Sequence, residues 1–117
     1  MNDIVGKVCS FLEPLKRYAN GDRSGRLISD FIYAIDQLAV EEPEFRNYVD
    51  VLAEYGIKWD GRDMEAYDVT EADERCIKAL LMGIYRGDHF CNGILESFIC
   101  NGVIIRWLER LKELSEN

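Results

Sequence analysis

The sequence predicts an all-α fold: a compact bundle of five to six short helices in a single domain spanning residues 1–117. Apolar residues recur at intervals of three and four along six segments, the periodicity of a helix with one buried face. No segment alternates strictly between apolar and polar residues over several positions, as a half-buried strand would. A chain of 117 residues has room for one hydrophobic core and not for two.

The N-terminal third is expected to hold two helices. An apolar stripe over residues 4–15 predicts the first, and Pro14 should kink or end it, because proline lacks the backbone N–H and clashes with the preceding turn. Residues 20–25 combine two glycines with polar side chains and predict a flexible loop. The wide apolar face of residues 27–39 then predicts a second helix.

A third helix is predicted from Pro43, a residue favoured in the first turn of helices, to Tyr55. Gly56 can end this helix in the left-handed conformation, and Ile57 would then fold back as the hydrophobic residue after the cap. Helical periodicity is lost over residues 58–69, so we expect an irregular or singly turned segment there.

The C-terminal half is expected to supply three more helices. Thr70, followed by acidic residues, predicts an N-terminal cap for a fourth helix that ends at Gly87. Asp88 can cap a fifth helix over residues 90–99, which an Asn-Gly pair closes. The apolar stripe of residues 104–114 predicts the sixth.

The last helix places Ile104, Trp107 and Leu111 on one face, with charged residues on the other. This pattern favours packing into the core of the same chain. The alternative is a homodimer that forms through these three residues, because C-terminal helices often pack across two-fold axes.

The charge balance narrows the classes of partner. The chain carries 14 Lys and Arg against 22 Asp and Glu, a net charge of -8. Proteins that bind nucleic-acid backbones or anionic membranes usually have the opposite balance, so neither partner is expected. No stretch approaches the roughly 18 apolar residues of a membrane-spanning helix. The four cysteines are irregularly spaced, which favours reduced thiols and a cytoplasmic location, and no cofactor is expected.

The negative charge is concentrated in the middle of the chain. From Asp36 to Glu74 there are 13 carboxylates against three basic residues, whereas both ends are nearly neutral. A solvated acidic face is one explanation, and divalent-metal binding is another. The third is a surface that recognises a basic protein partner or a cationic ligand, because aromatic residues are interleaved with the acids. The residues of this candidate surface are Tyr48, Tyr55, Trp59, Asp60, Asp63 and Tyr67.

One enzyme-like pattern occurs in the same segment. Glu41-x-x-Glu44 is followed, after twenty residues, by Glu65-x-x-Asp68. These pairs resemble the carboxylate signature of the all-α nucleoside triphosphate pyrophosphohydrolases, in which acids three apart on helices hold Mg²⁺ against phosphates. The resemblance implies Mg²⁺-dependent nucleotide phosphohydrolysis as the alternative to a non-enzymatic interaction module.

The C-terminal half contains the motif Arg86-Gly87-Asp88-His89-Phe90-Cys91-Asn92-Gly93-Ile94-Leu95, then an Asn-Gly break and Leu108-Glu109-Arg110-Leu111. It resembles a bacterial family of small proteins classed as a domain of unknown function. The pattern of that family reads Arg-x-Asp-Arg-Phe-Cys-x-Gly-x-Leu, a Ser-Gly or Asn-Gly break, then Ile-Leu-x-x-Leu. The resemblance implies an all-α bacterial cytoplasmic protein and supplies no activity or catalytic residue.

Physical chemistry predicts structural roles for this motif. Asp88 caps the fifth helix, and Arg86 can pair with a nearby carboxylate. Phe90 is expected to enter the core, and Gly93 to let another helix approach closely. Cys91 would lie in the first turn of the helix, where the helix dipole can lower the pKa of a thiol.

Overall fold

The computed structural model describes residues 3–23 and 25–116, and the absence of any strand in these two ranges confirms the all-α prediction. The helices are α1 (Asp3–Cys9), α2 (Leu12–Ala19), α3 (Leu27–Glu41), the 3-10 helix η1 (Pro43–Asn47), α4 (Tyr48–Glu54), α5 (Gly61–Ala66), α6 (Glu74–Gly87), α7 (Ile94–Cys100) and α8 (Val103–Ser115). The predicted segments are therefore divided more finely than expected. Within the described residues, no helix has the length and apolar content needed to cross a membrane.

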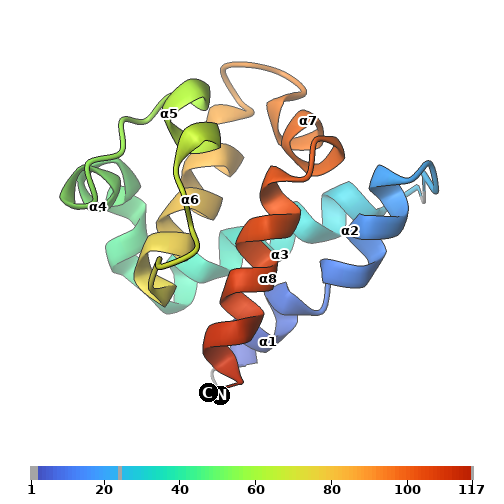
Figure 1. Ribbon diagram of the computed structural model, residues 1–117, viewed down its shortest axis with the longest axis horizontal. Helices are drawn as coiled ribbons and strands as arrows, with labels where there is room; N and C mark the ends of the chain where they lie inside the picture. Colours follow the sequence, from blue (N-terminus) through green and yellow to red (C-terminus); the bar gives the residue numbers. More distant parts are fainter. Residues whose placement is uncertain (1–2, 24, 117) are drawn as a thin grey trace.

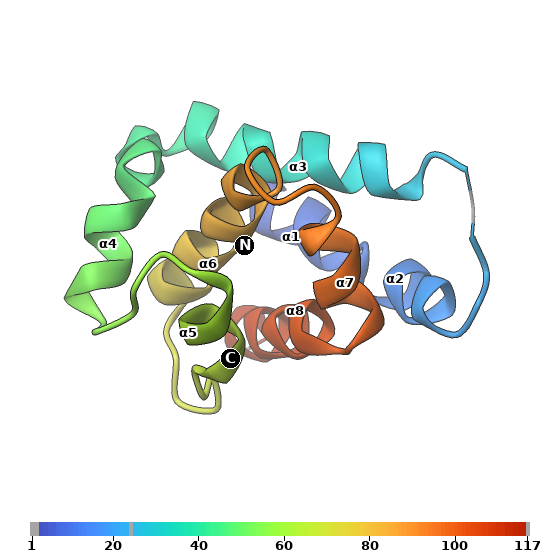
Figure 2. The same ribbon diagram turned by 90° about the horizontal axis from the view of Figure 1, so that it is seen from above.

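Helix α6 lies at the centre of the fold. It packs against α3, α4, α5, α7 and α8, and its residues from Cys76 to Ile84 are all buried. Helix α8 crosses in front of α3 in Figure 1, with α4 and α2 at opposite ends of the molecule. From above, α3 and α8 lie on opposite sides, with α6 and α1 between them (Figure 2). This arrangement encloses one hydrophobic core.

The predicted first helix consists of two helices, because the chain breaks between α1 and α2. Pro14 lies in the first turn of α2, where its missing N–H leaves no hydrogen bond unmade. In a continuous helix, its ring would clash with the carbonyl of Ser10, four residues earlier. The chain avoids this clash because α1 ends at Cys9. The break therefore lies one turn before the proline.

The predicted third helix is confirmed at its end and modified at its start. Pro43 begins a 3-10 turn, and regular α-helix starts only at Tyr48. Gly56 has a positive φ of 75°, and the N–H of Ile57 donates to the carbonyl of Leu52 at 3.0 Å. Ile57 is buried, as expected for a left-handed cap followed by a hydrophobic residue.

The segment expected to be irregular or singly turned contains the short helix α5. Asp60 caps it, because its carboxylate accepts a hydrogen bond from the N–H of Asp63 at 2.7 Å. The predicted cap of the next helix is wrong. Asp73, not Thr70, caps α6 by accepting from the N–H of Cys76 at 2.8 Å, and Thr70 instead donates its hydroxyl to Asp68.

The apolar face of α8 is part of the core, as favoured from the sequence. Trp107 is 1% exposed and contacts Phe98 edge-on, with the ring centroids 5.9 Å apart. Ile104 and Leu111 are also buried. Packing within the chain therefore covers all three residues proposed for the alternative homodimer.

Candidate functional site

The motif that follows α6 forms a loop, not the start of a helix. Residues 88–93 form turns, and α7 begins only at Ile94. Asp88 nevertheless acts as a cap from within the loop. Its Oδ1 accepts hydrogen bonds from the N–H groups of Gly93 at 3.1 Å and Leu95 at 3.2 Å. The predicted fifth helix thus starts later than expected, and Asp88 holds the loop against its first turn.

The loop changes the predicted roles of the other motif residues. Phe90 is not in the core but 81% exposed, and Cys91 is exposed outside the helix. Gly93 has a φ of 93°, and a Cβ there would meet no atom within 4 Å, so it provides a backbone conformation and not a close approach. Within the described ranges Arg86 forms no ion pair; its guanidinium lies 6.0 Å from the ring centroid of Tyr85.

Trp59 connects this loop to the centre of the fold. Its indole Nε1 donates a hydrogen bond to the carbonyl of Gly83 in α6 at 2.9 Å. Its ring meets Tyr48 edge-on at 5.2 Å between centroids, and Phe90 at 5.8 Å. The hydrogen bond fixes the orientation of the half-buried indole, which in turn supports the exposed Phe90.

An apolar groove of about 290 Å³ opens beside these two rings. We call it the Trp59–Phe90 groove. Met64 and Ile94 contribute aliphatic side chains to its lining, and Asp60 contributes a carboxylate. The full lining is Trp59, Asp60, Gly61, Met64, Gly87, Phe90, Cys91 and Ile94. The groove therefore joins the aromatic middle of the chain to the motif loop.

Replacing Gly83 by alanine is expected to lower the free energy of unfolding. A Cβ there would lie 2.9 Å from the sulfur of Met64 and 3.2 Å from Cδ1 of Leu52, both buried beside Trp59. Overpacking costs about 1–3 kcal/mol, which exceeds the roughly 1 kcal/mol gained from helix propensity. Urea unfolding should show a net loss of about 1 kcal/mol.

Gly87→Ala is the matched control for this prediction. Its Cβ would lie 3.9 Å from Nε1 of Trp59, an ordinary contact, in the same helix. It should leave the free energy of unfolding unchanged or raise it slightly. Equal effects of the two substitutions would contradict a steric origin for the loss at Gly83.

The aromatic residues of the predicted acidic and aromatic surface fall into two groups, one near the groove and one away from it. Tyr48, Tyr55, Trp59 and Tyr67 are all half-buried and pack against the core. Tyr48 and Trp59 lie near the groove. The hydroxyl of Tyr55 instead donates to the carboxylate of Asp73 at 2.8 Å. Tyr67 is also partly buried, and this burial is the main cause that raises the pKa of its hydroxyl.

The acids of this surface have structural contacts. Asp60 caps α5, and Oδ2 of Asp63 accepts from the backbone N–H of Lys58 at 3.1 Å. Of the six predicted residues, Trp59 and Asp60 line the groove, and Tyr48 lies beside it in contact with Trp59. Phe90, the most exposed aromatic residue there, was expected in the core, and its place at the surface was not predicted.

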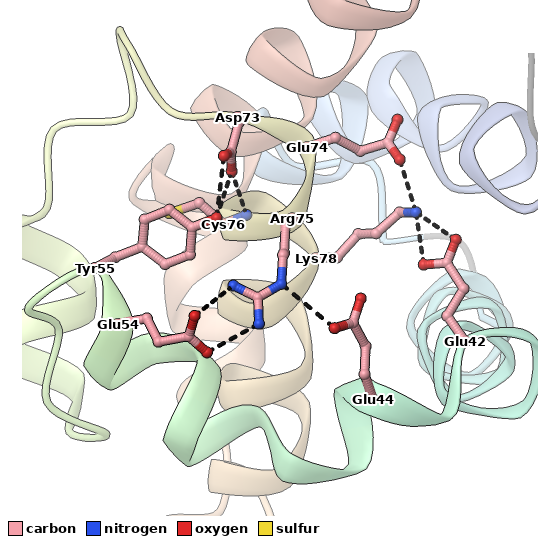
Figure 3. A network of polar contacts seen from close by, with 9 residues as sticks. All are labelled: Glu42, Glu44, Glu54, Tyr55, Asp73, Glu74, Arg75, Cys76 and Lys78. Carbon is pink, nitrogen blue, oxygen red and sulfur yellow. Dashed lines mark hydrogen bonds and ion pairs between the residues drawn. The ribbon is translucent and has the colours of Figure 1, made fainter.

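Part of the central negative charge is used to attach η1 and α4 to α6 (Figure 3). Arg75 forms two hydrogen bonds with Glu54, at 2.9 and 3.1 Å, and a longer contact with Glu44 at 3.4 Å. The hydrogen bonds from Arg75 lower the pKa of Glu54. These ion pairs are at the surface, where each contributes little to stability, so their role is to fix geometry.

Lys78 forms the buried half of the same network. Its side chain lies inside the fold, with Nζ 2.7 Å from both carboxylate oxygens of Glu42 and 2.8 Å from Glu74. Figure 3 shows the ammonium group held between the two carboxylates. Neither Lys78 nor Arg75 was predicted as a contact residue from the sequence. The spacing of Glu74 and Lys78, four apart on one helix, was the available local signal.

The two carboxylate pairs proposed for Mg²⁺ do not converge. Glu44 contacts Arg75, Glu65 accepts a hydrogen bond from Asn101 at 3.3 Å, and Asp68 accepts from Thr70. Glu41 is the last residue of α3. No group of three or more His, Cys, Asp or Glu side chains in residues 3–23 and 25–116 is placed to hold a metal ion. In the described part of the chain, Glu41, Glu44, Glu65 and Asp68 are therefore not brought together around one point.

All four cysteines are free thiols. Cys76 is buried beneath Tyr67, and burial raises the pKa of its thiol to about 11. Burial also raises the pKa of Cys9. Cys91, the thiol at the groove, is exposed. The two less accessible thiols are therefore held protonated at neutral pH, which suits packing more than nucleophilic attack.

Comparison with known proteins gives one finding. Residues 57–117, slightly more than half of the chain, match the model of a "Family of unknown function (DUF6508)". This agrees with the resemblance of the C-terminal motif to a family of small proteins of unknown function. Every residue that lines the Trp59–Phe90 groove lies within the matched range. Neither the curated proteins nor the solved structures gave a match.

Proposed function

The chain belongs to the family of unknown function DUF6508, and on this premise we propose that it is a protein-interaction module. The Trp59–Phe90 groove binds an apolar side chain from a basic segment of a partner protein. The observation that carries the proposal is the 81% exposure of Phe90 at the rim of an apolar groove. Large apolar side chains exposed beside a concave apolar surface are typical of interaction sites.

Packing supports Phe90 as a binding residue. Its ring rests on Trp59, which is itself held by the hydrogen bond to Gly83. A preorganised aromatic side chain loses little conformational entropy when a partner covers it, so more of the contact energy remains for binding. Ile94 adds apolar surface to the groove, and Met64, which is 1% exposed, lines it from within the core.

Charge supports a basic partner segment. Residues 60–68, three of which line the groove, contain four carboxylates against the single cation Arg62. Lys or Arg residues flanking the apolar anchor would lie near these carboxylates and would increase the association rate. The proposed module is non-enzymatic, bacterial and cytoplasmic, with residues 1–117 as its single domain and no nucleic-acid partner; these remain predictions from the sequence.

Phe90→Ser is expected to weaken partner binding at least tenfold and to change the free energy of unfolding by less than about 0.5 kcal/mol, because the ring is exposed. The probe is a set of random peptides selected for binding to the wild-type chain by surface display. Selected peptides should combine Leu, Phe or Trp with flanking Lys or Arg, and their affinity is measured by titration.

The matched control is Tyr33→Ser, which removes another exposed aromatic side chain, 64% exposed, from α3. It should leave peptide affinity unchanged. The proposal fails if no peptide is selected, if the selected peptides are acidic, or if they bind the Phe90→Ser variant as tightly as the wild type.

A further inference from the structure

A second hollow, of about 430 Å³, lies between α3, the start of α4 and the end of α6, and it differs in chemistry from the groove. Two arginines, Arg46 from η1 and Arg86 from α6, line it. Its volume lies within the range of small-molecule sites, about 300–1,000 Å³. The hollow is independent of the peptide groove, because the two share no lining residue.

A guanidinium group has five N–H donors, so Arg46 and Arg86 can bind a ligand even though Arg86 also interacts with the hydroxyl of Tyr85. Neither Arg46 nor Arg86 forms an ion pair with a carboxylate in residues 3–23 and 25–116, whereas Arg75, on the same helix as Arg86, contacts two. This is notable because 13 carboxylates lie between Asp36 and Glu74, the part of the chain that contains Arg46. Guanidinium groups bind carboxylates and phosphates in a bidentate manner.

One carboxylate, Asp36, also lines the hollow, and its Oδ1 accepts a hydrogen bond from the hydroxyl of Tyr85 at 3.1 Å. Two arginines and one aspartate give the lining a formal charge of +1 in a chain whose net charge is -8. The hollow is therefore a local cationic site, and its formal charge of +1 suits a ligand with a single anionic group.

The rest of the lining is apolar or aromatic. Val40 supplies exposed aliphatic surface, and the buried Ala39 and Met82 complete the apolar lining. The ring of Tyr48 is held by its edge contact with Trp59. A free inorganic ion would leave this surface without a partner. A ligand with an apolar body would cover it and gain from its burial.

We propose that this hollow binds a small organic oxyanion, with its carboxylate or phosphate group between Arg46 and Arg86 and its apolar body against Met82 and Tyr48. The Tyr85 hydroxyl is oriented by Asp36, and the ring of Tyr85 supports the guanidinium of Arg86. The site is thus formed by residues from four elements, α3, η1, α4 and α6, that the fold brings together.

The test is a titration of the ¹⁵N-labelled full chain, followed by NMR, with four probes: phenyl phosphate, 3-phenylpropionate, inorganic phosphate and benzyl alcohol. The two organic anions should cause saturable shifts at residues of the hollow, with dissociation constants at or below about 1 mM. Inorganic phosphate and benzyl alcohol should bind at least tenfold more weakly, because each lacks one half of the recognised chemistry.

Arg46→Gln and Arg86→Gln should each weaken phenyl phosphate binding at least tenfold, while Arg62→Gln and Arg106→Gln, which remove exposed arginines outside the hollow, should not. Unchanged melting temperatures will show that the variants fold. Phe90→Ser should leave this binding intact, which separates the site from the peptide groove. The proposal is overturned if no probe saturates, if inorganic phosphate or benzyl alcohol binds as well as phenyl phosphate, or if the control arginines matter equally.

Discussion

Replacing Trp107 by alanine is expected to lower the free energy of unfolding by about 3–5 kcal/mol. The indole is 1% exposed and is surrounded by buried residues of α7 and α8, including Phe98. Its removal takes the largest buried side chain out of the core and leaves a cavity that rigid neighbouring helices fill only in part. Urea unfolding followed by circular dichroism gives the loss without depending on tryptophan fluorescence.

Two further variants make the result interpretable. Trp107→Phe leaves a smaller cavity, so it should lose less stability and remain measurable if the alanine variant does not fold. Arg106→Ala, at the exposed neighbouring position of α8, should change the free energy of unfolding by less than about 0.5 kcal/mol. A loss below about 1 kcal/mol for Trp107→Ala would contradict the place of this residue in the core.

The features that the sequence predicts well depend on contacts within one or two helical turns. The apolar stripe that contains Trp107 follows from helical periodicity. The left-handed cap at Gly56 and the return of Ile57 to the core involve residues no more than five positions apart. Local sequence determines such features because the side chains and backbone groups that form them are close together in the sequence.

The position of the α6 cap shows where local reasoning ends. Thr70 and Asp73 can both cap a helix, and nothing nearby in the sequence decides between them. In the fold, Nε of Arg110 on α8 donates to the carbonyl of Ala72 at 2.8 Å, and the side chain of Ala72 is buried. These tertiary contacts hold the residues before Asp73 outside the helix, so the later cap is used.

The candidate sites depend on contacts between distant residues, which a single sequence does not specify. Trp59 and the Gly83 carbonyl are 24 positions apart. Arg46 and Arg86 come together at one hollow only because η1 packs against α6. Composition did indicate that the middle of the chain is rich in acids and aromatic residues, but it did not indicate which acids are paired inside the fold.

Lys78→Ala is expected to lower the free energy of unfolding by about 3–5 kcal/mol, because it removes a large buried side chain together with its ion pairs. Lys78 is 1% exposed, and its ammonium group contacts two carboxylates that come from different elements. Alanine removes the aliphatic part of the side chain and the positive charge that lies between Glu42 and Glu74, so the repulsion between these two carboxylates increases. Urea unfolding at pH 7 measures the loss.

Lys78→Met separates the charge from the packing, because methionine keeps much of the side-chain volume. The carboxylates of Glu42 and Glu74 are partly exposed and can regain water, so the loss should be smaller, about 1–3 kcal/mol. A double-mutant cycle with Glu42→Gln then isolates the interaction between Lys78 and Glu42, which are 36 positions apart. An interaction energy near zero would show that packing alone makes Lys78 important.

The pH dependence of the stability difference between the wild type and Lys78→Met tests whether Lys78 is charged in the folded protein. Burial alone would lower the pKa of Lys78, but the hydrogen bonds to Glu42 and Glu74 outweigh it and raise the pKa above the ordinary value of 10.5. A raised pKa in the folded state means that the stabilisation is complete below pH 10.5 and is lost as the pH rises through the folded-state value. The stability gap between the wild type and Lys78→Met should therefore stay constant from neutral pH until the pH approaches 10.5 and shrink only above it. A gap that already shrinks steadily between pH 7 and pH 9 would contradict a charged Lys78 held by two carboxylates.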